Sequence, residues 1–385
     1  MRIGVVAYEM EGARTGVGRY LEGLLEGLVR CARDGRGRGR ENSWRLFFKG
    51  DPFEHPLWSG RAGGDLEIEP VFDERPRARP ILWEQLRLPR LLRRTELDLV
   101  FSPGYSLPAT GPVPAMVTVH DLSFEHLPEE FPWKERWRRR LLARRAVRQA
   151  RRVLTDTRRV ADDLVETYLL DPDKIAVVPL ALDGDALADR DGSEDASVLE
   201  AQGVRRPYLL CLGSILDRRR LDVVIETFGR LAAEDRDLTL VIAGRNRLRE
   251  PRRLERWIAA SPAADRIVRM GYVPEKAIGP LYRQAELSLY LSSYEGYGLP
   301  PLESLAAGTP AVASPGQALD DLWSDYPYLC GRLDVDSAAA TVRAALADRD
   351  RRQEICGEAG RRLAGLTWQR SAELLLDEIE RAVDR

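Results

Sequence analysis

The residues best suited to chemistry lie in one short segment, Tyr294-Glu-Gly-Tyr297-Gly-Leu-Pro-Pro-Leu-Glu303. A strand pattern ends just before it. A helix is predicted to begin near Pro300, because proline is favourable in the first helical turn, where its missing N–H would be unpaired anyway. The free N–H groups of Gly298 and Leu299, together with the helix dipole, then form an anion site that suits a phosphate.

Two carboxylates flank this predicted anion site. Glu295 precedes it, and Glu303 lies one turn inside the helix. Ionised carboxylates only accept hydrogen bonds and sugars are rich in hydroxyl donors, so both positions suit hydroxyl recognition. For Glu303 a second interpretation stays open, namely a glutamate that merely complements the helix dipole.

Three consecutive arginines, Arg218-Arg219-Arg220, follow a predicted strand that ends at Gly213. Guanidinium groups at the carboxyl end of a strand can hold a diphosphate through bidentate, charge-assisted hydrogen bonds. The alternative is a solvated charge run, but the position after a strand favours function. In either case we expect exposed side chains whose removal hardly changes stability.

Two features of the first half are weaker signals. Gly16-Val-Gly-Arg-Tyr20 joins the first strand to the first helix but lacks the third glycine of a dinucleotide-binding fingerprint. His120 ends a strand pattern at the edge where ligands bind, yet a lone histidine is more often structural.

The sequence predicts no bound metal and no disulfide. The Asp-x-Asp triplets fall in loops without further ligands, so we expect no metal site. The cysteines form no Cys-x-x-Cys pair, and we expect free, buried thiols that fit a reducing cytoplasm. These residues are Asp171/Asp173, Asp183/Asp185, Asp235/Asp237, Asp334/Asp336, Cys31, Cys211, Cys330 and Cys356.

Short apolar runs alternate with amphipathic stretches, which predicts βαβ units and a doubly wound, mainly parallel sheet in each half. In such sheets ligands bind beyond the carboxyl ends of the strands, and the two edges can face each other across a cleft. We expect strands near 2–8, 44–49, 66–71, 97–102, 114–119, 152–155, 175–178, 207–213, 238–244, 267–270, 286–291, 309–314 and 327–330, and helices near 17–33, 81–94, 133–150 and 157–168.

A length of 385 residues suggests two or three domains. We place the boundaries at 1–184, an N-terminal domain, 185–366, a second domain, and 367–385, a C-terminal helix. The polar stretch 189–197 is expected to connect the two domains, and 35–43 to be a surface loop.

Charge and hydropathy exclude several classes of protein. The 59 Lys+Arg and 61 Asp+Glu leave a net charge of −2, so a general nucleic-acid binder is not expected. No apolar run is long enough to span a membrane, and the first strand turns polar at Glu9, too early for a signal peptide. We therefore expect a cytoplasmic protein.

One basic stretch allows contact with the inner face of a membrane. From Lys134 to Val153 there are ten basic residues and one acid, Glu135, with Trp133, Trp137 and Leu141 on one helix face. Such a helix could touch anionic lipid. The solvated outer face of a packed helix is the more ordinary interpretation.

Four motifs in this order resemble the retaining, nucleotide-sugar-dependent glycosyltransferases of family 4, which have the GT-B fold. They are Gly-x-Gly-Arg-Tyr, Val-x-Val-His-Asp, Gly-Ser-x-x-x-Arg-Arg and Glu-Gly-Tyr-Gly-Leu-Pro-Pro-Leu-Glu. The resemblance spans nearly the whole chain, including 83–89, 178–183 and the terminal helix. It implies two Rossmann-like domains facing a cleft, 1–184 on the acceptor side and 185–366 binding the donor, with the last helix crossing back onto the first.

The resemblance also implies roles. Glu303 would hold the ribose, Glu295 the sugar hydroxyls, and Arg218 and Arg219 the diphosphate, while His120 would line the sugar pocket. The implied catalytic residues are thus Glu295, Arg218, Arg219 and His120, and the implied donor-binding residues are Glu303, Gly16, Gly213, Gly244, Tyr297, Gly298 and Leu299. The family usually has Arg-Lys-Asn at 218–220 and Gly-Lys-Gly where Gly244-Arg-Asn stands here.

The sequence therefore predicts a retaining, metal-independent glycosyltransferase that needs no cofactor. It would move a sugar from a nucleotide diphosphate sugar to a hydroxyl of a glycan, a lipid-linked sugar or a small molecule. One alternative is a non-hydrolysing sugar-nucleotide epimerase on the same fold. The other is a catalytically silent binding partner, against which the intact Glu295 and Glu303 speak.

Overall fold

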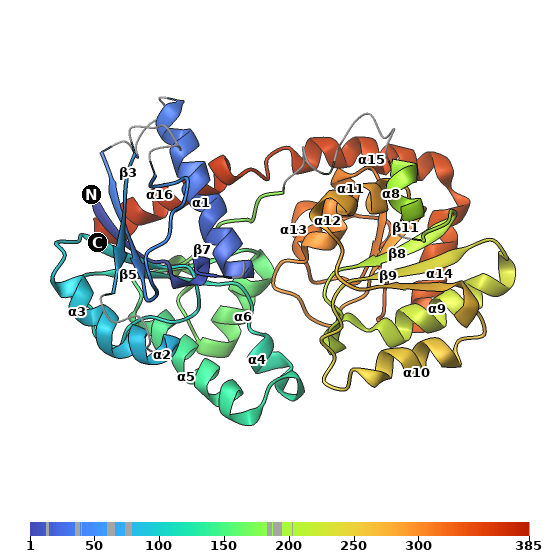
Figure 1. Cartoon of the computed structure of the whole chain (residues 1–385), viewed down its shortest axis with the longest axis horizontal. Coiled ribbons are helices and arrows are strands. Elements are labelled where there is room, and N and C mark those ends of the chain that lie inside the picture. The colour runs from blue at the N-terminus through green and yellow to red at the C-terminus, as the bar shows by residue number, and fades with distance from the viewer. Residues whose placement is uncertain are drawn as a thin grey trace. The chain divides into compact units, whose positions relative to one another are not determined.

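The computed structural model describes residues 1–12, 15–34, 39, 41–59, 66–73, 79–182, 187, 195–201 and 203–384. The chain divides into two compact units (Figure 1). The first unit is Met1–Ala181 with Leu366–Arg385, and the second is Leu182–Gly365. Most of the expected connection 189–197 and of the expected loop 35–43 lies outside the described residues.

Within the described residues, the first unit is built on a seven-stranded parallel sheet in the order β3-β2-β1-β4-β5-β6-β7. Its strands are β1 (Arg2–Val6), β2 (Ser43–Phe48), β3 (Glu67–Phe72), β4 (Leu99–Ser102), β5 (Ala115–Val119), β6 (Arg152–Thr155) and β7 (Ile175–Val177). The strand order reverses between β1 and β4. The loops that leave β1 and β4 run to opposite sides of the sheet there, so we expect ligands to bind at this edge.

The second unit repeats the arrangement, with a five-stranded parallel sheet among the described residues in the order β10-β9-β8-β11-β12. Its strands are β8 (Tyr208–Leu212), β9 (Thr239–Ala243), β10 (Ile267–Met270), β11 (Leu287–Tyr290) and β12 (Ala311–Ala313). The order reverses between β8 and β11, which gives this unit an equivalent binding edge.

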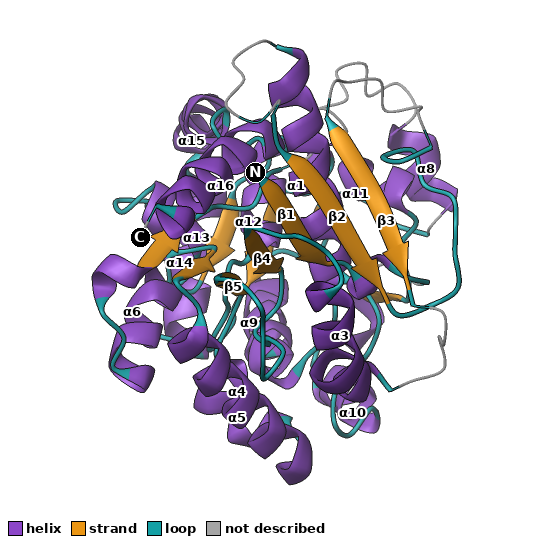
Figure 2. Cartoon of the chain, turned by 90° about the vertical axis from the view of Figure 1, so that its left-hand side faces the viewer, coloured by secondary structure: helices purple, strands orange, loops and turns teal. Residues whose placement is uncertain are grey.

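Helices cover both faces of each sheet, as Figures 1 and 2 show. In the first unit they are α1 (Gly16–Arg33), α2 (Pro80–Leu82), α3 (Leu88–Arg93), α4 (Ser123–His126), α5 (Trp133–Gln149), α6 (Arg158–Tyr168) and α16 (Trp368–Val383). In the second they are α8 (Asp195–Ala201), α9 (Leu221–Glu234), α10 (Arg252–Ala260), α11 (Glu275–Arg283), α12 (Leu299–Ala306), α13 (Ala318–Leu322), α14 (Val335–Ala347) and α15 (Arg349–Leu363).

Short 3₁₀ turns join several of these elements. They are Tyr8–Met10, Pro128–Glu130, Pro172–Lys174, Asp217–Arg219 and Ala264–Arg266. The turn Asp217–Arg219 is the one that matters for function, because it carries two of the candidate arginines.

The C-terminal helix α16 completes the core of the first unit. Its apolar residues join the buried cluster formed by α1 and one face of the sheet. Two glycines of α1 make room for it: a Cβ on Gly23 would lie 2.1 Å from the ring of Trp368, and one on Gly27 would lie 2.1 Å from the Trp368 carbonyl oxygen. The expected fold class is therefore confirmed, including the helix that crosses back.

A buried ion pair also ties α16 to the sheet. Arg152 at the start of β6 donates to Glu378 of α16, and both side chains are 7% exposed. Arg152 was counted in the basic stretch 134–153, but this pairing removes it from the surface.

The helix expected over 81–94 is interrupted. Residues Trp83–Arg87 form a π-helical turn between α2 and α3, and the N–H of Leu88 donates to the carbonyl of Trp83. Pro89 explains the break, because it has no N–H to donate and its ring would clash with the carbonyl one turn earlier in a continuous α-helix.

The strand expected over 327–330 was also wrong. Only a single bridge joins Leu329 to Ala313 of β12. The hydroxyl of Tyr326 accepts from the Ala311 N–H at 3.0 Å and donates to the Ala311 carbonyl at 2.8 Å, so it occupies groups that a neighbouring strand would use.

The end of the expected connection is helical rather than irregular. Asp195 begins α8 and is buried, with two hydrogen bonds from Arg283, at 2.6 and 2.9 Å. These hydrogen bonds to Arg283 lead the causes that hold the pKa of Asp195 below its usual value. Across the residues that the structure describes, no helix is long and apolar enough to cross a membrane.

Candidate active site

The second unit gathers the charged candidates at its reversal point, between the loops that follow β8 and β11. The 3₁₀ turn after β8 carries Arg218 and Arg219, and the loop after β11 carries Glu295. The carbonyl of Arg218 accepts from the N–H of Ser293 at 2.8 Å and from the hydroxyl of Ser292 at 3.3 Å. The two loops are therefore bonded to each other through their backbones.

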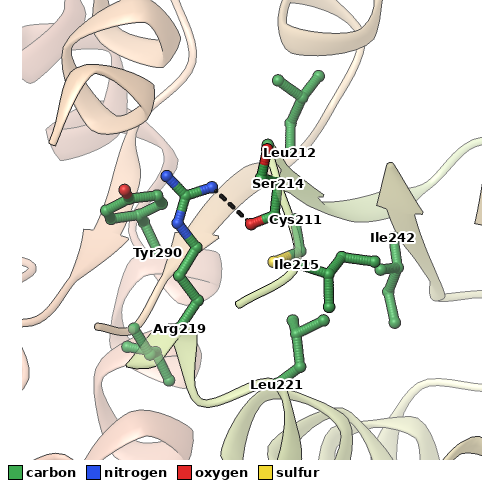
Figure 3. A pocket seen from close by; sticks show the side chains of 10 residues that line it. Cys211, Leu212, Ser214, Ile215, Arg219, Leu221, Ile242 and Tyr290 are labelled. Atoms are coloured by element: carbon green, nitrogen blue, oxygen red, sulfur yellow. Dashed lines mark hydrogen bonds between the residues drawn. The ribbon is translucent and has the colours of Figure 1, made fainter. Parts of the chain in front are cut away.

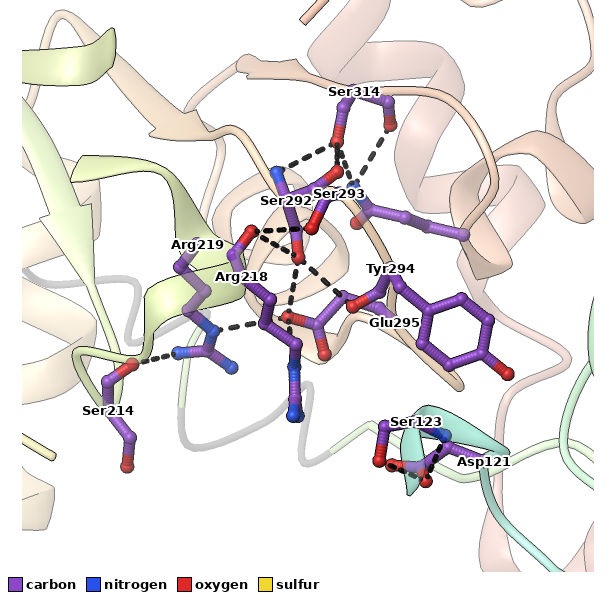
Figure 4. A network of polar contacts seen from close by, with 11 residues as sticks. Asp121, Ser123, Ser214, Arg218, Arg219, Ser292, Ser293, Tyr294, Glu295 and Ser314 are labelled. Carbon is purple, nitrogen blue, oxygen red and sulfur yellow. Dashed lines mark hydrogen bonds and ion pairs between the residues drawn. The ribbon is translucent and has the colours of Figure 1, made fainter. Parts of the chain in front are cut away.

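The guanidinium groups of Arg218 and Arg219 converge on one carboxylate oxygen of Glu295, as Figure 4 shows. Oε1 of Glu295 accepts from Nε of Arg219 at 3.2 Å and lies 3.6 Å from Nε of Arg218. Ser292 donates to the same oxygen at 3.0 Å. Glu295 is 6% exposed, and the arginine side chains are 16% and 17% exposed. The expectation of exposed arginines was therefore wrong, because the turn folds them against Glu295.

Arg219 is held on two further sides (Figure 3). Its Nη1 donates to the carbonyl of Ser214 at 2.9 Å, and its guanidinium lies 4.9 Å from the ring centre of Tyr290. The surrounding cavity, which Cys211 also lines, measures about 10 Å³, roughly the space of one water molecule. Burial raises the pKa of the Cys211 thiol to about 12, so this thiol is protonated at neutral pH.

Glycine is required at two of the candidate positions around this turn. Gly213 has φ +124°, and a Cβ there would lie 2.4 Å from Nη1 of Arg219. Gly244, after β9, has φ +144°, and a Cβ there would lie 1.9 Å from the carbonyl oxygen of Gly213. A side chain at Gly213 would strain the backbone and push the Arg219 guanidinium aside, and one at Gly244 would displace the backbone at Gly213.

Helix α12 begins one residue before the expected position, at Leu299, and Gly298 precedes it with φ +80°. Pro300 and Pro301 have no N–H, so the donors at this helix end are the N–H groups of Gly298 and Leu299. The expected anion site is therefore narrow and depends on these two groups. Tyr297 is buried beside it, and its carbonyl accepts from the N–H of Ala318.

Glu303 lies one turn into α12, in a different setting from Glu295. Its Oε2 accepts from the hydroxyl of Tyr282 of α11 at 3.0 Å. Burial, and then the charge of Glu303, raise the pKa of Tyr282 well above its usual value. Tyr282 therefore stays a donor and orients this carboxylate.

A buried polar network behind the arginines was not predicted from the sequence. Ser314 donates to the carbonyl of Ser292 at 2.6 Å and accepts from the N–H of Ser292 at 2.9 Å. The amide of Gln317 donates to the carbonyl of Ser314 at 3.0 Å, and a Cβ on Gly298 would lie 2.5 Å from Oε1 of Gln317. This network positions the loop that carries Glu295 against the start of α12.

The third arginine points elsewhere. Arg220 caps α9 with φ +37° and forms hydrogen bonds to both carboxylate oxygens of Asp222, at 3.0 and 2.9 Å. The asparagine that the resembling family usually has at this position tolerates a positive φ better than arginine does. Arg220 therefore stands outside the Arg218–Arg219–Glu295 cluster.

The first-half candidates lie in the first unit. His120 follows β5, and Nδ1 of its ring lies 2.7 Å from Oδ2 of Asp156 while Nε2 donates to the Pro103 carbonyl at 2.9 Å. Burial alone would lower the pKa of His120, but the charge and hydrogen bond of Asp156 and the Pro103 carbonyl raise it. The acceptors on both sides fix the orientation of the ring and favour its protonated form.

His120 lines a cavity of about 200 Å³ at the reversal point of the first sheet. Gly16 does not line it, but its neighbour Val17 does, and a Cβ on Gly16 would meet nothing within 4 Å. The walls come mainly from the loops after β1, β4 and β5 and combine aromatic with charged residues. The remaining lining residues are Val6, Tyr8, Glu9, Ser102, Pro103, Gly104, Tyr105, Ser106, Asp121, Phe124 and Arg139.

A buried glutamate that the sequence analysis passed over supports this cavity. Glu84 is 2% exposed and accepts from Ser106 at 2.7 Å, Gln85 at 2.9 Å and the hydroxyl of Tyr8 at 3.4 Å. Burial raises the pKa of Glu84 despite these bonds. Since Tyr8 and Ser106 both line the cavity, Glu84 positions two of its walls.

Neither site contains a recognisable set of metal ligands. In the part of the chain that the structure describes, no three histidine, cysteine, aspartate or glutamate side chains gather as a metal would require. The four cysteines are free; Cys31 and Cys330 are buried, while Cys211 and Cys356 are half-buried rather than fully buried as expected.

Comparison with known proteins agrees with this architecture. The model of Glycosyltransferase Family 4 matches residues 15–185, and that of Glycosyl transferases group 1 matches residues 199–363. O-antigen chain mannosyltransferase B of Escherichia coli is 28% identical over 280 residues, 71% of this chain and 73% of that protein. MMP alpha-(1->4)-mannosyltransferase of Mycolicibacterium hassiacum is 27% identical over 322 residues, 78% of this chain and 75% of that protein.

Solved structures share the fold over the whole chain. Sucrose-phosphate synthase from Thermosynechococcus elongatus superposes with a TM-score of 0.73 at 17% identity, covering 100% of this chain and 99% of that one. HepE of Anabaena in complex with UDP-glucose superposes with a TM-score of 0.70 at 14% identity, covering 99% and 100%. The chain belongs to the glycosyltransferases of family 4, which have the GT-B fold and transfer a sugar from a nucleotide sugar.

Proposed function

We propose that this enzyme transfers the sugar with retention of its anomeric configuration and without a divalent metal ion. The observation that carries the proposal is the convergence of Arg218 and Arg219 on Glu295, within 3.6 Å. Two cations and the N–H groups of Gly298 and Leu299 supply positive charge where a diphosphate would leave. A metal ion would supply the same charge, so the cluster makes one unnecessary.

In the proposed reaction the bond between the anomeric carbon and the diphosphate oxygen breaks, and its electron pair stays on the diphosphate. The acceptor oxygen bonds to the anomeric carbon on the same face, and its proton passes to the departing diphosphate. Arg218 and Arg219 stabilise the charge that develops. Glu295 holds sugar hydroxyls, and Glu303, oriented by Tyr282, holds the ribose.

For the acceptor we propose the cavity of the first unit. Aromatic rings beside carboxylates suit a sugar, whose faces are apolar and whose hydroxyls are donors. Tyr8 and Tyr105 supply the rings, Glu9 and Asp121 the carboxylates, and His120 faces the same space. The E. coli and M. hassiacum relatives are mannosyltransferases, so a mannosyl donor is the first to test.

A panel of GDP- and UDP-sugars in thermal shift, followed by transfer to a sugar acceptor, tests the proposal. We expect one donor to stabilise the protein, turnover to survive EDTA, and the product to keep the donor's anomeric configuration. Loss of activity in EDTA with recovery in manganese would refute metal independence. An inverted product would refute retention.

A further inference from the structure

Helix α5 exposes three large apolar side chains in a row. Trp133, Trp137 and Leu141 are 68%, 62% and 70% exposed. Their spacing of four residues places them on one face of the helix. Single exposed apolar residues are ordinary, but a contiguous group of this size marks an interaction surface.

Packing within the first unit does not require these side chains. The buried residues of α5 are Ala143, Ala146 and Val147, all in its second half, where they join the cluster on the sheet. The first half, which carries both tryptophans, buries none of its residues. Figures 1 and 2 show this helix at the margin of the first unit.

Basic side chains flank the apolar row. Lys134, Arg138, Arg144, Arg145 and Arg148 are exposed. We call these five together with Trp133, Trp137 and Leu141 the basic–aromatic face.

The acid of the helix does not neutralise that face. Glu135 accepts from Arg139 at 2.6 Å and lies 4.0 Å from Arg138. Arg139 turns inward, over the rings of Tyr105 and Phe131, and lines the cavity of the first unit. The basic–aromatic face therefore keeps a strong positive charge.

The neighbouring helices repeat the pattern. Leu82 and Leu86 are 50% and 56% exposed, and the exposed Arg90, Arg93 and Arg94 follow in the chain. Arg93 donates to Thr110, while Arg145 of α5 donates to the adjacent carbonyl of Ala109. The basic ends of α3 and α5 thus flank one short segment.

We propose that the basic–aromatic face docks on an anionic phospholipid surface. Indole rings and leucine enter the boundary between headgroups and acyl chains, and arginines and lysine meet the lipid phosphates. A nucleic acid would use the charges but would leave the apolar row in water. Arg139 links this face to the cavity of the first unit, so a lipid-linked acceptor would reach that cavity directly. This last step rests on the proposed function, whereas the docking does not.

Flotation of the full chain with lipid vesicles tests the docking without donor or acceptor. Vesicles of phosphatidylcholine alone are compared with vesicles containing about one third phosphatidylglycerol, at low and high salt. We expect binding to the anionic vesicles that weakens with salt. Each surface arginine contributes about fivefold to such partitioning, so the triple variant Arg138→Gln/Arg144→Gln/Arg148→Gln should bind about a hundredfold more weakly.

A second triple variant, Trp133→Ser/Trp137→Ser/Leu141→Ser, keeps the charge and should bind at least about tenfold more weakly. Matched controls replace exposed residues elsewhere. Arg236→Gln/Arg349→Gln/Arg361→Gln removes three exposed arginines of the second unit. Leu169→Ser/Tyr272→Ser removes side chains that are 86% and 67% exposed. Both controls should bind like the wild type.

Three results would overturn the docking: no flotation of the wild type, equal binding to neutral and anionic vesicles, or normal binding by the serine triple variant. Binding to heparin that depends on the arginines but not on the tryptophans would indicate a polyanion partner instead. Transfer to a water-soluble acceptor should be unchanged in both triple variants. If the wild type does not float with the vesicles but still transfers the sugar, the docking is refuted and the proposed function is not.

Discussion

The replacement Glu295→Gln separates the charge of this carboxylate from its shape. Glutamine keeps an oxygen for Ser292, which donates at 3.0 Å, but removes the negative charge that lies 3.6 Å from Arg218 and 3.2 Å from Arg219. Glu303→Gln is the matched control, because its carboxylate bonds to Tyr282 instead. We expect Glu295→Gln to lose turnover but keep nucleoside diphosphate binding, and Glu303→Gln to do the reverse.

The expected magnitude follows from Coulomb's law. A carboxylate about 7 Å from a phosphate charge repels it by roughly 2 kcal/mol at an effective dielectric constant of about 20. Solvent screening reduces this to about 1 kcal/mol, so Glu295→Gln should bind the free nucleoside diphosphate about fivefold more tightly. Turnover should fall about a hundredfold, because the reacting sugar loses its positioning contact.

Glu303→Gln should behave conversely. Loss of a charge-assisted hydrogen bond to the ribose is worth about 1.5–3 kcal/mol, so the nucleoside diphosphate should bind roughly ten- to a hundredfold more weakly. The ribose is held alike before and during the reaction, so kcat should change little.

Calorimetry with the nucleoside diphosphate and steady-state kinetics measure both quantities on the same preparations. Weaker binding by Glu295→Gln would mean that the carboxylate mainly positions the arginines, and it would refute the charge argument. If Glu295→Gln abolished diphosphate binding while Glu303→Gln retained it, the two assignments would be reversed.

Three further outcomes can be measured. Arg218→Ala and Arg219→Ala should each lower kcat by roughly 10²–10³, and Arg219→Ala should also lower Tm because its side chain stacks on a buried ring; near-normal turnover in both would make the cluster structural. Gly23→Ala should lower the free energy of unfolding by about 1–3 kcal/mol in urea titration, since the new methyl overlaps Trp368, whereas Gly357→Ala in α15, with nothing within 4 Å, should not. The raised pKa of His120 gives a stability contribution that is complete below pH about 6.5 and is lost as pH rises through the raised value; Asp156→Asn removes the main cause of the raised pKa and should weaken or reverse this pH dependence, and an unchanged pH profile would contradict the ion pair.

The elements of the donor side were predictable because their signals are local. Pro300 and Pro301 mark a helix start through their missing N–H groups, and Gly298 supplies the positive φ just before it. Those signals placed α12 within one residue. The pairing of Glu295 with Arg218 and Arg219 depends instead on the order of β8 and β11 in the sheet, which no local pattern encodes.

The residues that were missed lack any spacing signal. Ser314 and Gln317 are buried polar residues whose partners come from another loop, so nothing in their own neighbourhood distinguishes them from loop residues. The sequence implied a pocket at His120, but the other walls of this cavity were missed for a related reason. Tyr8 and Tyr105 follow β1 and β4, which are distant in sequence and adjacent only in the sheet.

The groove that Gly23 and Gly27 open for Trp368 has a consequence for biosynthesis. Residues 1–181 leave the ribosome long before α16 does. Until α16 is made, the apolar face of the first unit that α16 covers stays exposed to solvent. The second unit, complete by Gly365, can fold earlier although it is translated later. A premature stop codon directly before α16 should therefore leave the later-made unit folded and the earlier-made one prone to aggregation and proteolysis.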